Sequence, residues 1–309
     1  MDFALTDDQK QLQETVRRFA VERLKPGYQQ RELDGHFDRS LVRAMGELGL
    51  ITPDLPEEHG GMGIDGPTAG LIIEQVGYGD IIVGYIPMLG SLCGQIMARH
   101  APPDMAREVL PKIARGETLV ALGLTEPRGG TDAAHLILRA RPDGNGYVLD
   151  GEKASISMAA QADQVLVAAR TGAESEGAHG VSMFLVDLTA PGVTRSAYND
   201  LGSKAVGRGS IWFDGVRVSA EQRVGAEGKG FTQVMQGFDY SRAMIALKCL
   251  GSAQASLDET WPYTVERQAF ERPIAQFQGV TFPLVEFDTQ IQAARLLCYR
   301  TLWLRDQGL

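Results

Sequence analysis

An apolar run near residue 120 ends in a turn rich in proline and glycine, and this feature constrains the local backbone more than any other in the sequence. Residues 119–122, Leu-Val-Ala-Leu, predict a buried strand. Pro127 and the glycine pair at 129–130 follow, and they predict a tight turn whose backbone can approach another group closely. Thr125 and Thr131 add uncharged hydrogen-bonding groups. The turn suits a planar ring with polar edges, such as a flavin, although an ordinary strand and turn explain the spacing as well.

Composition argues against some classes of partner. The chain has 309 residues, of which 44% are hydrophobic, so it is long enough for two or three subdomains with a substantial core. Its formal net charge of −9 argues against a nucleic-acid binder, which usually carries a basic face. The charge does not exclude a local basic pocket for a phosphorylated ligand. No metal-binding spacing is present, so no metal site is expected.

Cysteine usage and the first residues predict a cytoplasmic protein. Cys93, Cys249 and Cys298 lie far apart in apolar runs, so we expect buried free thiols in a reducing compartment. No basic segment precedes an apolar one at the start, so no signal peptide is expected. Residues 81–98 carry no formal charge, but a proline and three glycines interrupt them. These breaks favour two buried helical pieces over a membrane span.

Helical patterns flank a central region of short strands. Thr6 is the expected N-cap of the first helix, and Pro26-Gly27 its expected end. Asp150-Gly151 predicts the turn of a hairpin, and residues 173–179 an exposed loop. The expected helices cover approximately residues 7–24, 39–48, 67–79, 80–100, 103–115, 229–262 and 279–306, and the expected strands cover 119–122, 147–149, 164–169, 181–187 and 209–218.

Two sequence runs resemble signatures of the acyl-CoA dehydrogenase family. The run from Leu124 to Asp132, Leu-Thr-Glu-Pro-Arg-Gly-Gly-Thr-Asp, is similar to the family's first signature. His135, where the family usually has a small residue, is a minor departure. The run from Arg267 to Gln278 has the family's spacing of Arg, Phe, Ile and Gln. The loop at 55–63, with three glycines in four positions, also resembles a family segment.

The resemblance implies an α+β multidomain fold. It predicts an N-terminal helical domain (1–116), a middle β-barrel (117–228) and a C-terminal helical bundle (229–309). Only about two of the four bundle helices are expected within the chain, which would leave apolar helix faces uncovered. Either the sequence belongs to a truncated product, or a partner subunit covers that face. The resemblance also implies a homodimer or homotetramer.

The resemblance further implies FAD as cofactor and assigns residues to it. Ser155 stands where the family has a tryptophan that packs on the flavin, and Ser157 where a threonine bonds its N5 edge. A simple β-strand explains the spacing of 150–158 equally well, and a helix-linking loop is the alternative for 267–278. The cofactor residues expected from the resemblance are Leu122, Leu124, Thr125, Gly130, Thr131, Ser155 and Ser157, with Arg267, Phe270 and Gln278 reaching FAD from a neighbouring subunit.

Acyl-CoA contacts are implied at Thr131, Phe238, Asp239 and Arg242. Asp and Arg of the family's Phe-Asp-x-x-Arg segment hold the pantetheine and phosphate region, a role suited to the fixed fork of arginine. Asp239 and Arg242 are three residues apart on a predicted helix, so a surface ion pair is the alternative. The turn at 225–230 is not a dinucleotide-binding fingerprint, because no βαβ unit surrounds it.

The identity of the catalytic base is open at this stage. The family's usual glutamate would lie beyond residue 309, and a second known position is Ser241 here. Asp80 follows Gly79 at the start of an apolar helix, where an isolated carboxyl would be desolvated and its pKa raised toward that of a general base. In some ring-oxidising relatives an aspartate removes the proton. Asp80 could instead serve only as a helix N-cap.

The implied reaction is α,β-dehydrogenation of an acyl-CoA thioester, with electrons passed to an electron-transfer flavoprotein. Gly84, Pro87 and Gly90, together with Tyr85, favour a cyclic or branched acyl group. Two alternatives remain: a flavin oxidase on the same fold, and a non-catalytic homologue that binds CoA or a partner. The second is suggested by the missing base and by serine at position 155.

Overall fold

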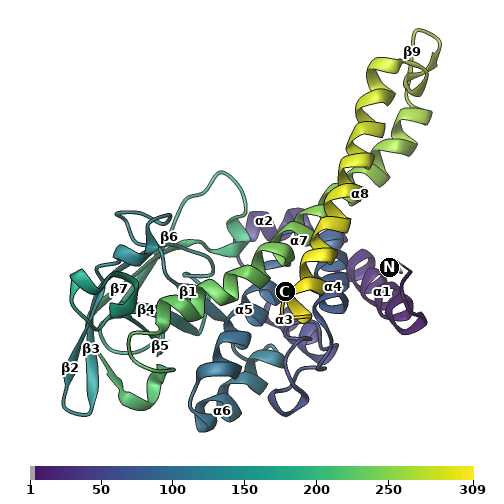
Figure 1. Cartoon of the computed structure of the whole chain (residues 1–309). Coiled ribbons are helices and arrows are strands. Elements are labelled where there is room, and N and C mark those ends of the chain that lie inside the picture. Colours follow the sequence, from purple (N-terminus) through teal and green to yellow (C-terminus); the bar gives the residue numbers. More distant parts are fainter. Residues whose placement is uncertain (1–3) are drawn as a thin grey trace. The chain divides into compact units, whose positions relative to one another are not determined.

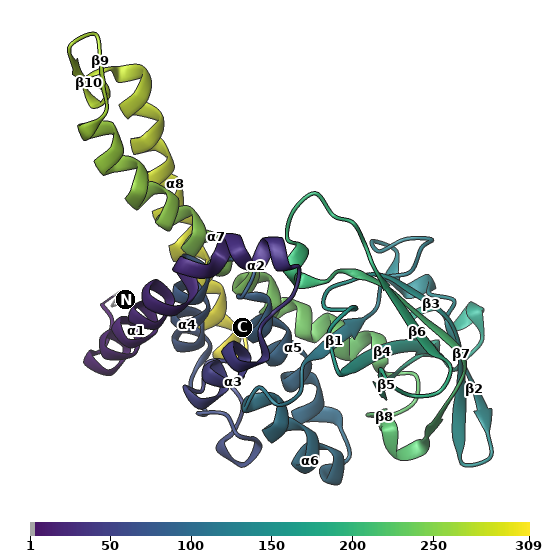
Figure 2. The same cartoon turned by 180° about the vertical axis from the view of Figure 1, so that it is seen from behind.

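Two units make up the chain, and each is assembled from segments that are far apart in the sequence. The computed structural model describes residues 4–309 and is shown from two sides in Figures 1 and 2. The first unit contains residues 1–28, 65–84 and 242–309, and the second contains 29–64 and 85–241. The helices are α1 Asp7–Phe19, α2 Tyr28–Asp34, α3 Arg39–Glu47, α4 Gly66–Gly79, α5 Tyr85–His100, α6 Pro103–Ala114, α7 Gly230–Glu266 and α8 Gln278–Asp306.

The first helix begins as the sequence predicts but does not end as predicted. The Thr6 hydroxyl accepts the Gln9 amide at 3.2 Å, and the Gln9 side chain accepts the Thr6 amide at 3.0 Å, which is a capping box. The expected stop at Pro26-Gly27 is wrong. A π-helical turn at Ala20–Leu24 and a 3-10 turn at Lys25–Gly27 lead directly into α2. Proline is tolerated there because it lies in the first turn, where its missing N–H is not needed.

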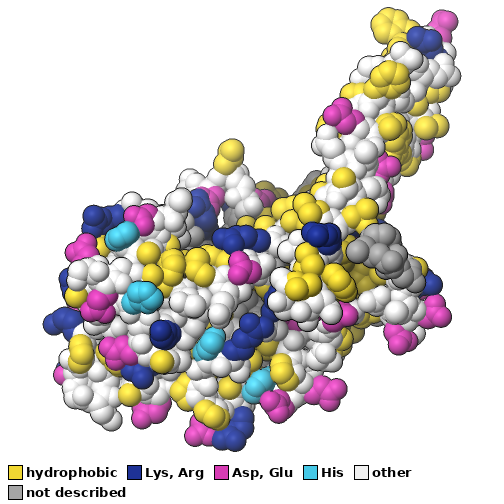
Figure 3. Space-filling view, viewed as in Figure 1, with side chains coloured by type: hydrophobic (Ala, Val, Ile, Leu, Met, Phe, Trp, Pro, Cys, Tyr) yellow, Lys and Arg dark blue, Asp and Glu magenta, His cyan; other side chains and the backbone are white. Residues whose placement is uncertain are grey.

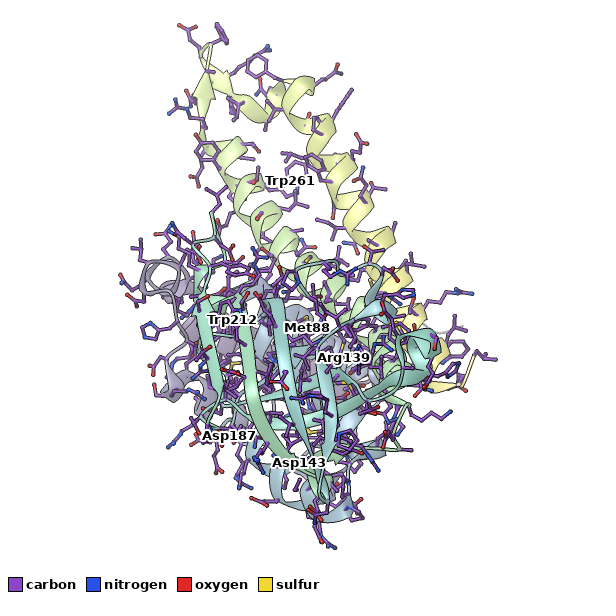
Figure 4. All side chains as sticks on the ribbon, turned by 90° about the vertical axis from the view of Figure 1, so that its left-hand side faces the viewer. Met88, Arg139, Asp143, Asp187, Trp212 and Trp261 are labelled. Carbon is purple, nitrogen blue, oxygen red and sulfur yellow. The ribbon has the colours of Figure 1, made fainter. Side chains whose placement is uncertain are left out.

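Helix α8 is fixed to α4 through a polar cluster around the buried Glu74. Arg295 Nε donates to Glu74 Oε1 at 2.7 Å, and the Tyr299 hydroxyl donates to Glu74 Oε2 at 2.6 Å. Farther along, α7 and α8 form a hairpin whose small core contains Leu257, Leu284 and Ile291. Figure 4 shows Trp261 of α7 beside α8, in agreement with its packing on that core.

The hairpin of α7 and α8 exposes many apolar side chains, as expected for part of a bundle. They are visible along it in Figure 3. The larger ones are Tyr263, Val265, Phe282, Val285, Phe287, Leu296, Leu297 and Trp303. What covers them stays a prediction. Cys249 on α7 is exposed, so its expected burial is wrong, whereas Cys93 and Cys298 are buried free thiols.

The apolar stretch at 81–98 differs from the prediction. Residues 81–84 form a turn, and α5 then runs unbroken from Tyr85 to His100. Pro87 lies in the first turn of α5, and a Cβ at Gly90 would come within 2.7 Å of Ile51 Cγ2. Helix packing therefore accounts for Gly90, and the expected break into two pieces is wrong. In residues 4–309 we find no helix long and apolar enough to cross a membrane, and the cytoplasmic location stays a prediction.

The second unit is built around one eight-stranded sheet. Its strands follow the order β6-β7-β3-β2-β4-β5-β8, and β1 pairs in parallel with β4. Figure 4 shows this sheet with Trp212 on β7 and Arg139 on β2 labelled. The strands are β1 Val120–Gly123, β2 Arg139–Asp143, β3 Gly146–Ile156, β4 Gln164–Arg170, β5 Val181–Asp187, β6 Val193–Ala197, β7 Gly209–Ser219 and β8 Arg223–Val224; β9 Gln268–Ala269 and β10 Arg272–Pro273 form a separate small pair.

The hairpin predicted at Asp150-Gly151 is wrong. Asp143 pairs with Gly146, so Gly144 and Asn145 form the turn between β2 and β3, and β3 continues through Gly151. A Gly144 φ of 60° explains why glycine occupies this turn. Strands β2 and β6 were not predicted, and the segment at 174–180 is a run of 3-10 turns rather than a plain loop.

Candidate functional site

The turn after β1 has the tight geometry that the sequence predicts. The Gly129 amide donates to the Glu126 carbonyl at 3.0 Å, and the return bond from Glu126 to Gly129 measures 3.4 Å. A Cβ at Gly130 would lie 3.2 Å from Thr125 Cγ2, so a larger residue would crowd the threonine. Thr125 is half-buried and Thr131 is exposed. The turn therefore offers backbone amides and the hydroxyls of Thr125 and Thr131 to a ligand, with the exposed Arg128 in the same turn.

A buried ion pair fixes the turn to the sheet. Lys153 of β3 is fully buried, and its ammonium donates to Glu126 Oε1 at 2.8 Å and to the Leu124 carbonyl at 3.0 Å. Glu126 also accepts the amides of Ile137 at 2.7 Å and Leu138 at 2.9 Å. Burial lowers the pKa of Lys153 to about 8, while Glu126 opposes that change. Sequence reasoning gave neither Glu126 nor Lys153 a role, because neither lies within an apolar run that would mark it as buried.

Strand β3 runs beside the same turn. The Ala154 amide donates to the Thr125 carbonyl at 2.9 Å; Ser155 is the next residue on β3, and Ser157 follows the end of the strand. Ser157 is half-buried, and within residues 4–309 its hydroxyl has no hydrogen-bond partner. Leu124 is buried and Leu122 half-buried on the strand that leads into the turn. The second unit thus groups the predicted contacts Leu122, Leu124, Thr125, Gly130, Thr131, Ser155 and Ser157.

The remaining predicted cofactor residues lie at the tip of the α7–α8 hairpin, in the first unit. Phe270 is 88% exposed with a φ of 53°, and its ring meets that of Phe277 edge-on at 6.2 Å. Arg267 and Gln278 are exposed as well. Such exposure suits residues that act on another copy of the chain. Their contact with a neighbouring subunit's FAD stays a prediction.

The predicted acyl-CoA residues lie on α7. Phe238 is half-buried, whereas Asp239 and Arg242 are exposed, so both charged side chains are accessible to a ligand. The division between the two units falls between Ser241 and Arg242. Their roles toward CoA stay predictions.

Asp80 is buried but not isolated, so the expectation of a lone carboxyl is wrong. It is 6% exposed, and its Oδ1 accepts the amides of Ile82 at 2.8 Å and Val83 at 3.4 Å. Asp80 therefore caps the turn at 81–84, not the first turn of α5. Lys248 of α7 is 3% exposed, and its stem runs so close to Gly84 that a Cβ there would lie 2.6 Å from Lys248 Cγ.

The charge of Asp80 acts on that lysine. Burial lowers the pKa of Lys248 to about 8, and Cys249 and Asp80 oppose this change. The negative charge of Asp80 thus favours the protonated form of the buried Lys248. Within residues 4–309 we find no cluster of three histidine, cysteine or acidic side chains that could hold a metal ion.

Comparison with known proteins identifies the chain. The N-terminal, middle and C-terminal domains of acyl-CoA dehydrogenases match residues 6–117, 121–216 and 228–309. The chain belongs to the acyl-CoA dehydrogenase family. It is 34% identical to a probable acyl-CoA dehydrogenase of Bacillus subtilis, over all of this chain and 82% of that protein. It is 33% identical to a glutaryl-CoA dehydrogenase of Desulfococcus multivorans, over all of this chain and 80% of that protein.

Solved structures agree with this assignment. A glutaryl-CoA dehydrogenase in complex with glutaryl-CoA superposes with a TM-score of 0.96 at 32% identity, covering 99% of this chain and 78% of that one. Butyryl-CoA dehydrogenase from Megasphaera elsdenii gives 0.94 at 30% identity, covering 100% and 82%. The predicted fold class, with helical terminal domains and a middle β domain, is confirmed. The three domain boundaries stay predictions.

The chain is an FAD-dependent oxidoreductase, as its family implies, and the non-catalytic alternative falls away. The residues at the turn fit a flavin. Thr125, Thr131 and the Ser157 hydroxyl supply polar groups without charge, as the edge of the ring requires. Arg267 is a suitable cation for the diphosphate of the cofactor.

Proposed function

We propose that this enzyme oxidises an acyl-CoA thioester between its α and β carbons and passes the electrons to an electron-transfer flavoprotein. Family membership supports the reaction, and the hydroxyls at the turn support a flavin at Thr125 and Ser157. FAD, when bound, accepts the hydride from the β-carbon. The chain's own residues must hold the thioester, stabilise charge on its carbonyl oxygen and remove the α-proton.

Asp80 is the residue that we propose as proton acceptor. The observation that carries this proposal is its buried carboxylate, held by the amides of Ile82 and Val83 and stabilised by the charge of Lys248. Ser241, at the family's second position for a base, is buried, and a serine hydroxyl is a poor base without an adjacent activating group. A carboxylate, by contrast, can take up a proton as a general base.

The proposed acyl group is cyclic or branched. Asp80 supports this preference, because some ring-oxidising members of the family use an aspartate for the same step. Breaks in the apolar stretch give it no support, since α5 is continuous from Tyr85 to His100. Turnover of a cyclic acyl-CoA should exceed that of a straight-chain thioester with the same number of carbons. Faster oxidation of the straight chain would contradict this part of the proposal.

Asp80→Asn tests the base. Asparagine keeps an oxygen that can accept the amides of Ile82 and Val83, but it cannot take a proton, so the cap survives and the base is lost. We expect kcat to fall by about 10²–10⁴-fold with unchanged FAD content, and the melting temperature to fall modestly because Lys248 loses the charge of Asp80. Asp65→Asn is the matched control, because Asp65 caps α4 by accepting the Thr68 amide at 2.8 Å. Unchanged turnover and pH profile in Asp80→Asn would remove Asp80 from the mechanism.

The electron acceptor is tested by reoxidation of the substrate-reduced enzyme. One similar structure comes from work on the electron-transferring flavoprotein of Acidaminococcus fermentans, which supports this class of acceptor; it superposes with a TM-score of 0.95 at 32% identity. In stopped-flow measurements we expect rapid reoxidation by an electron-transfer flavoprotein and slow reoxidation by air. Rapid reoxidation by air would identify the enzyme as an oxidase instead.

A further inference from the structure

A directed chain of hydrogen bonds ends at the exposed Ser155. The Ser155 amide donates to the Tyr198 hydroxyl at 3.2 Å, and the Tyr198 and Ser210 hydroxyl oxygens lie 2.9 Å apart. Ser210 donates to Glu152 Oε1 at 2.8 Å. Because a carboxylate only accepts, Tyr198 must donate to Ser210 and use its own oxygen for the Ser155 amide. This series of hydrogen bonds therefore fixes the backbone of Ser155, which has a left-handed φ of 57°.

A charged pair lies against the same serine. Arg208 Nη1 is 3.3 Å from Ser155 Oγ, and its guanidinium carbon is 5.1 Å from the centroid of the Tyr198 ring. Asp200 accepts two hydrogen bonds from Arg208, at 2.9 and 2.5 Å. The pKa of Arg208 is raised, first by Asp200 and also by Tyr198 and Tyr85. Arg208 thus stays charged, with Tyr85, at the start of α5, within its electrostatic reach.

We propose that Arg208, Asp200 and Tyr198 set the reduction potential of the bound flavin. Arg208 favours the reduced ring, which carries more negative charge, and Asp200 opposes it by partly neutralising Arg208. Tyr198 is the positioning residue that holds Ser155 between them and the ring. The proposal rests on the proposed function and on the resemblance, which implies that Ser155 and Ser157 face the flavin.

The test removes the positive charge of Arg208 in one variant and the negative charge of Asp200 in another, and compares the flavin reduction potentials. The full chain loaded with FAD is titrated spectroelectrochemically for the two-electron midpoint potential. Arg208→Gln should lower the potential and Asp200→Asn should raise it, each by about tenfold in the reduction equilibrium, or about 30 mV for two electrons. Arg208→Lys should retain most of the wild-type value. The matched control is Arg141→Gln, which breaks an exposed pair with Asp150 on β2 and β3 and should leave the potential unchanged.

Tyr198→Phe completes the test, because it keeps the ring but removes the acceptor for the Ser155 amide. We expect a shifted flavin absorption spectrum with an unchanged melting temperature. Equal potentials in wild type, Arg208→Gln and Asp200→Asn would overturn the proposal. A shift in the same direction in both variants, or loss of FAD from both, would also overturn it. If the wild-type protein takes up no FAD, the proposed function itself fails. If it takes up FAD but the three potentials are equal, only the proposal about the potential fails, so the two failures are distinguishable.

Discussion

Ser155 has a strained backbone conformation at the candidate site, and this strain lowers the stability of the fold. A left-handed backbone disfavours L residues by about 1–2 kcal/mol, whereas glycine adopts it freely. Ser155 has a φ of 57° in β3, and its hydroxyl accepts from Arg208. The strain therefore coincides with the residue that we place at the flavin.

Replacement of Ser155 should separate stability from site chemistry. Ser155→Gly should leave the free energy of unfolding unchanged or raise it by up to about 1 kcal/mol. Ser155→Val should lower it by more than about 1 kcal/mol, because a β-branched side chain tolerates this backbone poorly. Urea unfolding monitored by circular dichroism measures both. Equal stability of the two variants would show that the strain has no energetic consequence.

The lowered pKa of Lys248 predicts that the free energy of unfolding depends on pH. Its pKa of about 8 in the folded protein lies below the ordinary value of 10.5, so between these two pH values the unfolded chain binds more protons. Wild-type stability should then rise with pH relative to Lys248→Met, by up to about 1.4 kcal/mol per pH unit and about 3 kcal/mol in total. Urea unfolding of both proteins at pH 7, 8, 9 and 10 measures the difference. A constant difference would contradict a depressed pKa.

Elements were predictable where a local interaction sets their ends. The Thr6 capping box marks the start of α1, and Gly49, with a φ of 70°, lies two residues beyond the end of α3 at Glu47, one residue from the predicted end. Strands β2 and β6 were missed because almost all of their residues are exposed, so no apolar alternation marks them. Gly151 misled the hairpin prediction, since its φ of 139° fits a twisted position within β3 rather than a turn.

The tip between α7 and α8 should act in cofactor binding and not in folding. Arg267 is exposed and the tip has only a two-stranded pair of its own, β9 with β10. Arg267→Gln should leave helix content and melting temperature unchanged and weaken FAD binding by about tenfold or more, as expected for loss of a charge-assisted bond to a diphosphate. Fluorescence titration of the apoprotein with FAD measures this. Arg300→Gln on α8 is the control, and equal affinities in both variants would exclude Arg267 from the site.

For the molecule as a whole, sequence motifs found the candidate site but not what supports it. Thr125, Gly130 and Ser157 are expected from the family's signatures. The structure brings Gly130 next to Thr125 and pairs Ala154, three residues before Ser157, with the Thr125 carbonyl. The supporting residues Lys153, Tyr198 and Arg208 come from other strands and loops. No local pattern pairs residues so far apart in sequence, because their proximity depends on the pairing of β3 with β7.

The proposed FAD site requires two copies of the chain to assemble. If the turn of one copy and the Arg267 tip of another form each FAD site, two different defects can complement each other in a mixed dimer. Gly130→Val crowds Thr125 at the turn, and Arg267→Gln removes the cation at the tip. Each variant alone should bind FAD poorly. A mixed dimer has one doubly defective site and one intact site, so it should recover about one FAD per two chains.

Separately tagged copies, co-expressed and purified through both tags, allow this measurement by flavin absorbance per chain. If the turn and the tip of the same copy formed the site, every site in the mixed dimer would keep one defect, and no FAD would be recovered. Binding of FAD by a wild-type chain that stays monomeric would contradict the two-copy site directly. Because the two variants act on separate units of the chain, recovery cannot come from mutual repair of one folding defect. The exposure of Phe270 and Arg267 at the tip would then follow from their role, since both would be buried only by the neighbouring copy.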